Sequence, residues 1–285
     1  MILLRTVAEL RAAVSHARGS GSRVGLVPTM GAFHEGHLSL MRRAKAASGF
    51  VAVSLFVNPT QFNETADLNR YPRDEHGDAA MAEAEGVDVL FVPSVREVYP
   101  AGFTTTVEVA ALAAPLEGVV RGVQHFRGVA TVVTKLLNMV QPDEAYFGQK
   151  DAQQALVIRR LVRDLDLPVR IEICPTIREP DGLAMSSRNV LLDSASRARA
   201  TALSRALFAI ERAAHEGERR VDVLLDRGRA ILDTEHIVPE YLSAVDADTL
   251  APVETLDCET LVAIAARFGA VRLIDNVIVR PGVSA

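Results

Sequence analysis

The stretch Val24-Gly-Leu-Val-Pro-Thr-Met-Gly-Ala-Phe-His-Glu-Gly-His37 joins a short apolar run, through a turn that contains glycine, to the start of a polar segment. Val24–Pro28 predicts a buried strand, because it is rich in valine and bounded by proline. The residues from Gly36 to Ala47 predict a helix. A strand that leads through a turn into a helix is the repeating unit of a parallel α/β sheet. Ligands bind such sheets at the carboxyl ends of the strands, so this turn is the first candidate site.

The same alternation continues to about residue 175. Further strands are expected at residues 51–57, 87–92, 145–147 and 169–174. Further helices are expected at residues 6–18, 74–85, 129–140 and 151–165. This pattern predicts a Rossmann-like parallel sheet with helices on both faces.

After about residue 176 the pattern changes. Two helices are expected at residues 194–216 and 221–234, and three strands follow at residues 240–245, 260–266 and 271–279. Strands joined by short turns predict an antiparallel sheet. The expected domains are therefore residues 1–175 and a smaller α+β domain, residues 176–285. The segment Pro175-Thr-Ile-Arg-Glu-Pro-Asp-Gly182 is the expected hinge, because prolines and glycine interrupt regular structure there.

Composition excludes several classes of function. The 285 residues contain 31 Lys and Arg against 36 Asp and Glu, which argues against nucleic acid as a partner. The apolar runs are shorter than the ~20 residues that a bilayer requires, so no membrane span is expected. Charges from Arg5 onward interrupt any signal peptide, and Cys174 and Cys258 are too few for a disulfide framework. These features predict a cytoplasmic protein.

Three clusters carry residues suited to phosphate chemistry. In the first, Gly31 and Gly36 allow close approach of a ligand, the helix start offers N–H groups, and His34 and His37 are potential hydrogen-bond donors. The alternatives are two solvated histidines or a metal pair. A metal site needs a further ligand, and Glu35 is the only local carboxylate, so no protein-bound metal is expected.

The second and third clusters lie at Gly148-Gln-Lys-Asp151 and Met185-Ser-Ser-Arg188. Lys150 follows a predicted strand and can place a compact positive charge on a phosphate. Arg188, beside two hydroxyl residues in a loop, can stabilise a departing pyrophosphate. Taken singly, a solvated lysine and an ordinary polar loop are the favoured explanations of these two clusters. Together with the histidines, they indicate an enzyme that acts at the α-phosphate of ATP.

Five stretches in one order across the chain resemble pantothenate synthetase, also called pantoate–beta-alanine ligase, a family of the nucleotidyl-transferase superfamily. The stretches are Val27-Pro-Thr-Met-Gly-Ala-Phe-His-Glu-Gly-His37, Phe56-Val-Asn-Pro-Thr-Gln-Phe62, Tyr71-Pro-Arg73, Phe147-Gly-Gln-Lys-Asp151 with Gln154, and Met185-Ser-Ser-Arg-Asn189. The resemblance implies a ligase that converts (R)-pantoate and ATP to pantoyl adenylate and pyrophosphate, after which β-alanine displaces AMP to give pantothenate.

The resemblance also implies roles for individual residues. His34, His37, Lys150 and Arg188 would be catalytic, with His37 as the proton donor. ATP would be held by Met30, Gly31, Ala32, Phe33, His34, Glu35, Gly36, His37, Gly148, Gln149, Lys150, Asp151, Ile177, Met185, Ser186, Ser187 and Arg188. Gln61 and Gln154 would bind pantoate, with Gln61 also placing β-alanine. Asn58 is a further substrate contact, or else an ordinary turn residue before Pro59.

Further expectations concern the ion, the second domain and the assembly. Mg²⁺ is expected to accompany ATP, with few protein ligands. Asp78 is a possible outer contact, although a carboxylate on such a helix is more often solvated. The smaller domain is expected to act as a lid that closes over ATP. The family resemblance further implies a homodimer.

Two departures from the family pattern occur. The run Arg121-Gly-Val-Gln-His-Phe-Arg-Gly128 lacks the proline that is typical there and has one more residue between arginine and histidine, which predicts a looser flap and leaves the roles of Arg121 and His125 open. Gln149 stands where an acidic residue is common.

The alternatives to a ligase are another nucleotidyltransferase of the superfamily, which would need a phosphate-binding acceptor site, and a regulatory nucleotide-binding module.

Overall fold

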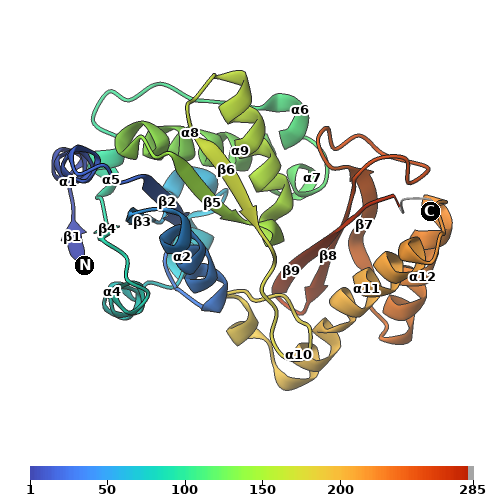
Figure 1. Ribbon diagram of the computed structural model, residues 1–285. Helices are drawn as coiled ribbons and strands as arrows, with labels where there is room; N and C mark the ends of the chain where they lie inside the picture. The colour runs from blue at the N-terminus through green and yellow to red at the C-terminus, as the bar shows by residue number, and fades with distance from the viewer. Residues whose placement is uncertain (282–285) are drawn as a thin grey trace. The chain divides into compact units, whose positions relative to one another are not determined.

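The computed structural model describes residues 1–281, apart from the side chain of Asp67 (Figure 1). The chain forms two compact units. The first comprises Met1–Gln149 and Gln153–Pro175, and the second comprises Lys150–Ala152 and the chain from Thr176 onward. The division differs from the expected boundary because Lys150–Ala152 groups with the second unit, where the Asn276 side chain donates a hydrogen bond to the Lys150 carbonyl.

The first unit is built on a six-stranded parallel sheet, as its alternating sequence predicts. The strands are β1 (Ile2–Leu4), β2 (Val24–Thr29), β3 (Phe50–Leu55), β4 (Val89–Phe91), β5 (Glu144–Gly148) and β6 (Arg170–Cys174), in the order β1-β4-β3-β2-β5-β6. The order reverses between β2 and β5, which pair at Gly25 and Leu26. Ligands bind parallel sheets where the order reverses, so the carboxyl ends of β2 and β5 are the favoured place for a site.

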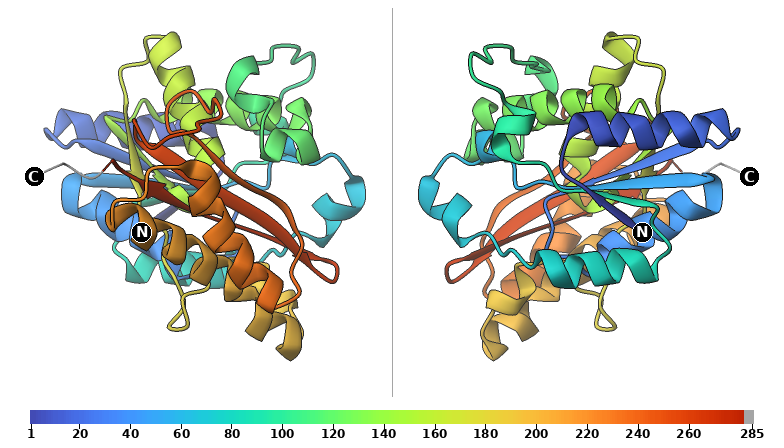
Figure 2. Two further views of the ribbon diagram at one scale, coloured as in Figure 1. Left: turned by 90° about the vertical axis from the view of Figure 1, so that its right-hand side faces the viewer. Right: turned by 90° about the vertical axis from the view of Figure 1, so that its left-hand side faces the viewer.

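Helices cover both faces of this sheet. Helices α1 (Val7–Gly19) and α8 (Val123–Val140) lie on one face, whereas α2 (Glu35–Ala47) and α4 (Glu75–Ala84) lie on the other (Figures 1 and 2). The remaining elements of this part of the chain are α3 (Thr65–Arg70), α5 (Val95–Val98), α6 (Ala110–Ala113), α7 (Glu117–Arg121), α9 (Ala152–Asp164) and two short 3-10 turns, η1 (Pro59–Gln61) and η2 (Gln149–Asp151). Buried side chains of β2, β3, β4 and α2 form a core beneath α2.

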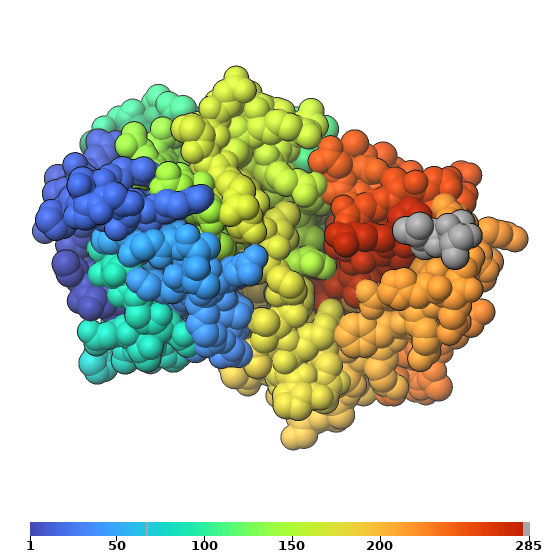
Figure 3. Space-filling model, viewed as in Figure 1, coloured from blue at the N-terminus to red at the C-terminus, as the bar shows by residue number. Residues whose placement is uncertain are grey.

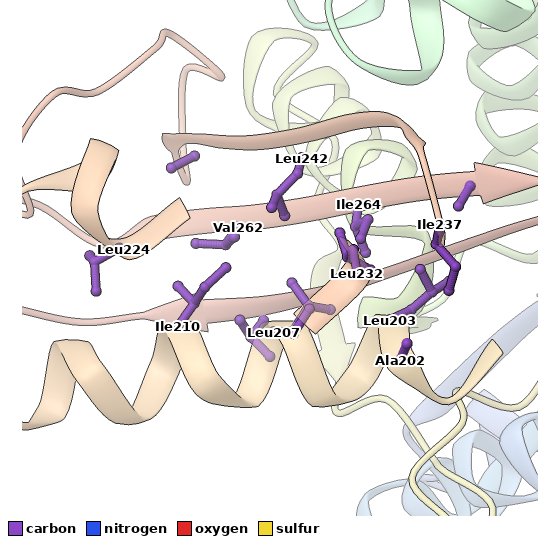
Figure 4. Close-up of a cluster of buried hydrophobic side chains, with 14 of the residues drawn as sticks. Ala202, Leu203, Leu207, Ile210, Leu224, Leu232, Ile237, Leu242, Val262 and Ile264 are labelled. Carbon is purple, nitrogen blue, oxygen red and sulfur yellow. The ribbon is translucent and has the colours of Figure 1, made fainter. Parts of the chain in front are cut away.

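The second unit contains the expected antiparallel sheet, β7 (Pro239–Asp246), β8 (Thr260–Phe268) and β9 (Val271–Val279), in the order β7-β8-β9. Helices α10 (Ser194–Ala200), α11 (Ala202–His215) and α12 (Val221–Thr234) accompany it. Figure 4 shows how Leu203, Leu207 and Ile210 of α11 point toward Val262 and Ile264 of β8, with which they form one buried cluster. A 3-10 turn, η3 (Asn189–Leu191), follows the loop that the sequence singled out.

Several boundaries differ from the sequence predictions. The helix predicted for residues 194–216 divides at Thr201, whose hydroxyl donates a hydrogen bond to the Ala198 carbonyl at 2.8 Å and so competes with the regular helical pattern. Helix α8 begins six residues earlier than the predicted residue 129. Strand β1 and the short helices α3, α5, α6 and α7 were not predicted, because each is too short to show a period.

Within residues 1–281, none of the helices combines the length and the apolar character that a bilayer-spanning helix needs.

Candidate active site

The turn after β2 is held by a buried carboxylate from α4. Asp78 is only 2% exposed, and it accepts hydrogen bonds from the backbone N–H groups of Ala32 at 2.8 Å and Phe33 at 2.7 Å. Burial raises the pKa of Asp78, and the two N–H groups partly oppose that shift. The sequence reasoning favoured a solvated carboxylate here; that was wrong, because α4 turns this side chain into the loop.

The backbone of this turn is strained, and the Asp78 contacts offset the strain. Gly31 has φ +84°, and Ala32 has φ +53°, a left-handed conformation that costs a non-glycine residue about 1 kcal/mol. A Cβ atom on Gly31 would lie 2.8 Å from an Asp78 carboxylate oxygen. Glycine is therefore required at position 31 for both its conformation and its small size.

The two histidines lie together at the start of α2. Their ring centroids are 4.3 Å apart, and the Phe33 ring lies 5.5 Å from that of His37. His34 caps the helix, because its Nδ1 accepts a hydrogen bond from the Gly36 N–H at 3.1 Å. A neutral His34 that accepts at Nδ1 carries its proton on Nε2, which makes Nε2 a hydrogen-bond donor.

Four of the N–H groups at this turn and helix start donate hydrogen bonds within the protein. Ala32 and Phe33 donate to Asp78, Gly36 donates to His34, and the His37 N–H donates to the His34 carbonyl at 2.8 Å. These four N–H groups serve to hold the turn and the helix start in place. The Glu35 carboxylate instead pairs with Arg42 at the surface. Nowhere in residues 1–281 do three or more His, Cys, Asp or Glu side chains gather as a metal site would require.

A second group of predicted residues assembles beside Met30. The Gln61 amide donates from Nε2 to the Met30 sulfur at 3.1 Å and accepts at Oε1 from the Asn58 amide at 3.1 Å. The His125 Nδ1 lies 2.8 Å from the Gln61 carbonyl oxygen. A cavity of about 390 Å³ opens next to Met30 and Asp78, at the same edge of the sheet.

Asn58 is buried to 1% exposure, and its side chain is occupied by protein contacts. Its amide also donates to the Gly128 carbonyl at 3.2 Å, and its oxygen accepts from the Thr60 N–H at 3.3 Å and the Tyr99 hydroxyl at 2.9 Å. These contacts make Asn58 a turn residue that also orients the Gln61 amide, and its contact with substrate stays a prediction.

Helix α8 approaches the η1 turn very closely at Gly128. A Cβ atom at position 128 would lie 2.5 Å from the Thr60 carbonyl oxygen and 2.8 Å from the Gln61 nitrogen. No real side chain fits at those distances. Gly128 therefore sets how near the Gln61 backbone comes to the helix.

The run that departs from the family pattern is helical. It forms the end of α7 and the beginning of α8, with Gly122 at φ +75° between them. Arg121 pairs with Glu117 at 2.9 Å, and Asn63 donates to the Arg121 carbonyl. The altered run is thus tied to residues near Gln61, through Asn63 and through His125.

Sequence reasoning missed a clamp next to Gln154. The neighbouring Gln153 is buried; it accepts from the Glu117 N–H at 2.9 Å and donates to the carbonyls of Leu112 and Pro115 at 2.8 and 2.7 Å. It therefore fixes the α6–α7 segment. Gln154 itself is half-buried on α9. Burial in the structure separates the two amides, because Gln153 is only 5% exposed.

The lysine cluster lies where β5 ends. Gly148 is the last residue of the strand, and Gln149, Lys150 and Asp151 form η2. The Lys150 Nζ is 3.8 Å from an Asp151 carboxylate oxygen, and the Lys150 side chain is 19% exposed.

The Ser-Ser-Arg loop follows a small hairpin in the second unit. Arg178 and Ala184 form an isolated β-bridge, and the Met185 N–H donates to the Ile177 carbonyl at 2.9 Å. The Ser186 hydroxyl accepts from the Arg188 N–H at 3.2 Å, while Ser187 and Arg188 are half-buried. Within residues 176–281 no carboxylate forms an ion pair with Arg188. The segment lies at the molecular surface, coloured yellow in Figure 3.

Comparisons with known proteins show the family to which the chain is similar. A family model described as pantoate-beta-alanine ligase matches residues 2–278. The pantothenate synthetase of Roseiflexus castenholzii is 54% identical over 279 residues, which cover 98% of this chain and 99% of that protein. The crystal structure of pantothenate synthetase from Thermus thermophilus superposes with a TM-score of 0.92 at 47% identity, over 99% of this chain and 100% of that one. Pantoate-beta-alanine ligase from Francisella tularensis, crystallised with beta-gamma ATP and beta-alanine, gives a TM-score of 0.77 at 34% identity, over 98% and 97% of the two chains.

Proposed function

This chain belongs to the pantoate–beta-alanine ligase family, and from that premise we propose which of its residues carry out the reaction. The reaction joins (R)-pantoate and β-alanine to form pantothenate at the expense of ATP. A pantoate carboxylate oxygen attacks the α-phosphorus, the bond to the β-phosphate oxygen breaks, and pyrophosphate leaves. The β-alanine amine then attacks the acyl carbon of pantoyl adenylate, and AMP departs.

The observation that carries the residue assignment is the pairing of His34 and His37 where β2 ends, beside the reversal of strand order. Negative charge grows on the leaving pyrophosphate as the bond breaks, so donors already in place stabilise the transition state more than the bound substrate. The His34 Nε2 donor, the His37 imidazole, the Lys150 ammonium and the Arg188 guanidinium supply such groups. The Met30–His37 turn, Gly148–Asp151, Ile177 and the Met185–Arg188 loop hold ATP in this proposal, and the second unit acts as the lid.

Gln61 and Gln154 bind the hydroxyl and carboxylate groups of pantoate, because a neutral amide both donates and accepts hydrogen bonds. The support for Gln61 is its fixed orientation between Met30 and Asn58. Asn58 contributes by holding that amide. An enzyme that transfers AMP to a phosphate acceptor needs cationic groups at the acceptor, and uncharged amides do not provide them.

Mg²⁺ enters this scheme as part of the ATP substrate, held by phosphate oxygens and water. The support is that Asp78, the carboxylate that holds the turn, is occupied by the Ala32 and Phe33 N–H groups. We further propose a cytoplasmic homodimer. The family resemblance supports the dimer. The two free thiols, Cys174 and Cys258, support a reducing compartment.

The test is pyrophosphate release in a single turnover with MgATP and pantoate, followed by addition of β-alanine. We expect a burst of about one equivalent of pyrophosphate per enzyme molecule, followed by continuous pyrophosphate release once β-alanine is added. Lys150→Ala, Arg188→Ala and His37→Ala should each slow the burst by roughly 10²–10³-fold. Arg205→Ala is the matched control, because Arg205 pairs with Glu235 at the surface of the same unit as Arg188. An unchanged burst in Arg188→Ala would refute the assignment of that residue.

A further inference from the structure

A buried ion pair in the second unit is linked by hydrogen bonds to Lys150 on one side and to the hairpin before the Arg188 loop on the other. Asp275, in the middle of β9, is 3% exposed, and burial raises its pKa, an effect that Arg178 opposes. The Arg178 guanidinium binds both carboxylate oxygens, at 2.6 and 3.0 Å. A buried carboxylate is tolerated only when it is paired in this way.

The Arg178 end of this pair fixes the hairpin that precedes the Ser-Ser-Arg loop. Beyond Asp275, the Arg178 guanidinium donates to the Gly182 carbonyl at 3.1 Å, across the hairpin that closes at Ala184. Its guanidinium carbon also lies 4.8 Å from the centre of the Phe208 ring on α11. The hairpin therefore has a fixed position relative to β9 and α11, and Met185 begins directly after it.

The Asp275 end reaches Lys150. A carboxylate oxygen of Asp275 accepts from the Asn276 backbone N–H at 2.7 Å. The Asn276 side chain, itself 3% exposed, donates to the Lys150 carbonyl at 3.0 Å. This contact joins β9 to a residue 126 positions earlier in the chain. It also places Lys150 in the second unit, although β5 immediately before it belongs to the first.

From these contacts we propose that Asn276 and the Arg178–Asp275 pair are positioning residues, which hold the Lys150 backbone and the start of the Ser-Ser-Arg loop in one rigid frame. The inference rests on the proposed roles of Lys150 and Arg188. Two cations that must meet one pyrophosphate group benefit from a fixed separation, because misplacement by about 1 Å costs up to 10²-fold in rate. A buried ion pair adds little net stability over apolar residues, so its geometric precision is its main contribution.

The test is a double-mutant cycle between Asn276 and Lys150, read by single-turnover pyrophosphate release. Asn276→Ala should lower the burst rate roughly tenfold while the KM for ATP changes less than about twofold, because the lysine acts on the transition state. In a Lys150→Ala background the same substitution should have no further effect, since the group that Asn276 positions is gone. Asn276→Ser removes the same amide donor with a smaller loss of polarity, and serves if Asn276→Ala does not fold.

Val277→Ala is the matched control, because Val277 is the next residue of β9 and its side chain belongs to the apolar core. It should lower the melting temperature and leave the burst rate unchanged. If Asn276→Ala slows the burst equally with and without Lys150, or slows it no more than Val277→Ala does, the positioning role is refuted. If Lys150→Ala alone has no effect, the proposed function of Lys150 fails instead, so the two failures are distinguishable.

Discussion

The substitution Gly128→Ala tests whether the close approach of α8 to η1 sets the position of Gln61. In an open helix interior, replacing glycine by alanine stabilises a protein by roughly 1 kcal/mol. Here the new Cβ would lie 2.5 Å from the Thr60 carbonyl oxygen, whereas real contacts of this kind are at least 3.0 Å. The helix and the turn must therefore separate by at least 0.5 Å, the difference between these two values.

That displacement has two consequences of known size. Overpacking against backbone atoms costs about 1–3 kcal/mol, which outweighs the helical gain, so Gly128→Ala should lower the free energy of unfolding. The displaced atoms belong to Thr60 and Gln61, and the Asn58 amide that donates to the Gly128 carbonyl also orients Gln61. A shift of this size should lower kcat/KM for pantoate by roughly 10- to 100-fold.

The assay pairs denaturant unfolding with steady-state kinetics at varied pantoate. Gly19→Ala is the control, because Gly19 is likewise a glycine within a helix of the first unit, and nothing lies within 4 Å of a Cβ there. The control should be neutral or slightly stabilising, with unchanged kinetics. A Gly128→Ala protein with stability and kcat/KM for pantoate equal to those of the control would refute the reasoning.

Three further predictions concern single side chains. Asp78→Asn should lower stability by about 2 kcal/mol and raise the KM for ATP, because an asparagine amide has a single acceptor oxygen, so one of the two N–H groups of the turn loses its acceptor. Asp74→Asn, at the cap of the same helix, is the control in both measurements, and an unchanged KM would count against the clamp. Burial and the hydrogen bond to Glu144 raise the pKa of Tyr146 to about 12. In an absorbance titration one tyrosine should therefore ionise at a higher pH than the others, and Tyr146→Phe should remove that component. The stability that the neutral Tyr146 hydroxyl contributes should be complete below pH 10 and should be lost as the pH rises toward 12. The Thr249 hydroxyl and N–H hold the pKa of Asp246 at about 2, below its ordinary 3.8. Asp246→Ala should therefore lower the free energy of unfolding by about 1 kcal/mol at neutral pH. Measured by chemical denaturation, this difference in stability should vanish as the pH falls from 3.8 toward 2, and a difference that stays constant with pH would contradict the prediction.

The sequence predicts the parts of the fold that repeat with a period. The β2 strand, α12 and β9 appear within one residue of the predicted bounds, because alternation or helical spacing is a local property. The position of the histidine pair follows from the same reasoning, since it depends only on a strand that leads into a helix. The chemistry predicted for residues such as Ile177 and Gln154 remains a prediction.

Features that depend on distant partners were not predictable. Asp78 lies 46 positions from Ala32, and its helical pattern gives no sign that it turns inward. The amides of Gln153 and Gln154 are equivalent in sequence, yet burial assigns the first to a structural clamp. Lys150 groups with the second unit, and the Asn276 side chain that donates to its carbonyl lies 126 positions later in the chain. Such contacts arise from tertiary packing, which periodicity does not encode.

The assignment of Lys150–Ala152 to the second unit changes how this protein can be dissected. The chain passes from one unit to the other at three places, after Gln149, after Ala152 and after Pro175. A truncated protein that ends at residue 175 would retain Lys150 but lose the amide that anchors its backbone. A split at residue 175 therefore separates Lys150 from the side chain that donates to its carbonyl, and a split-protein design at that point should lose any activity that depends on this hydrogen bond.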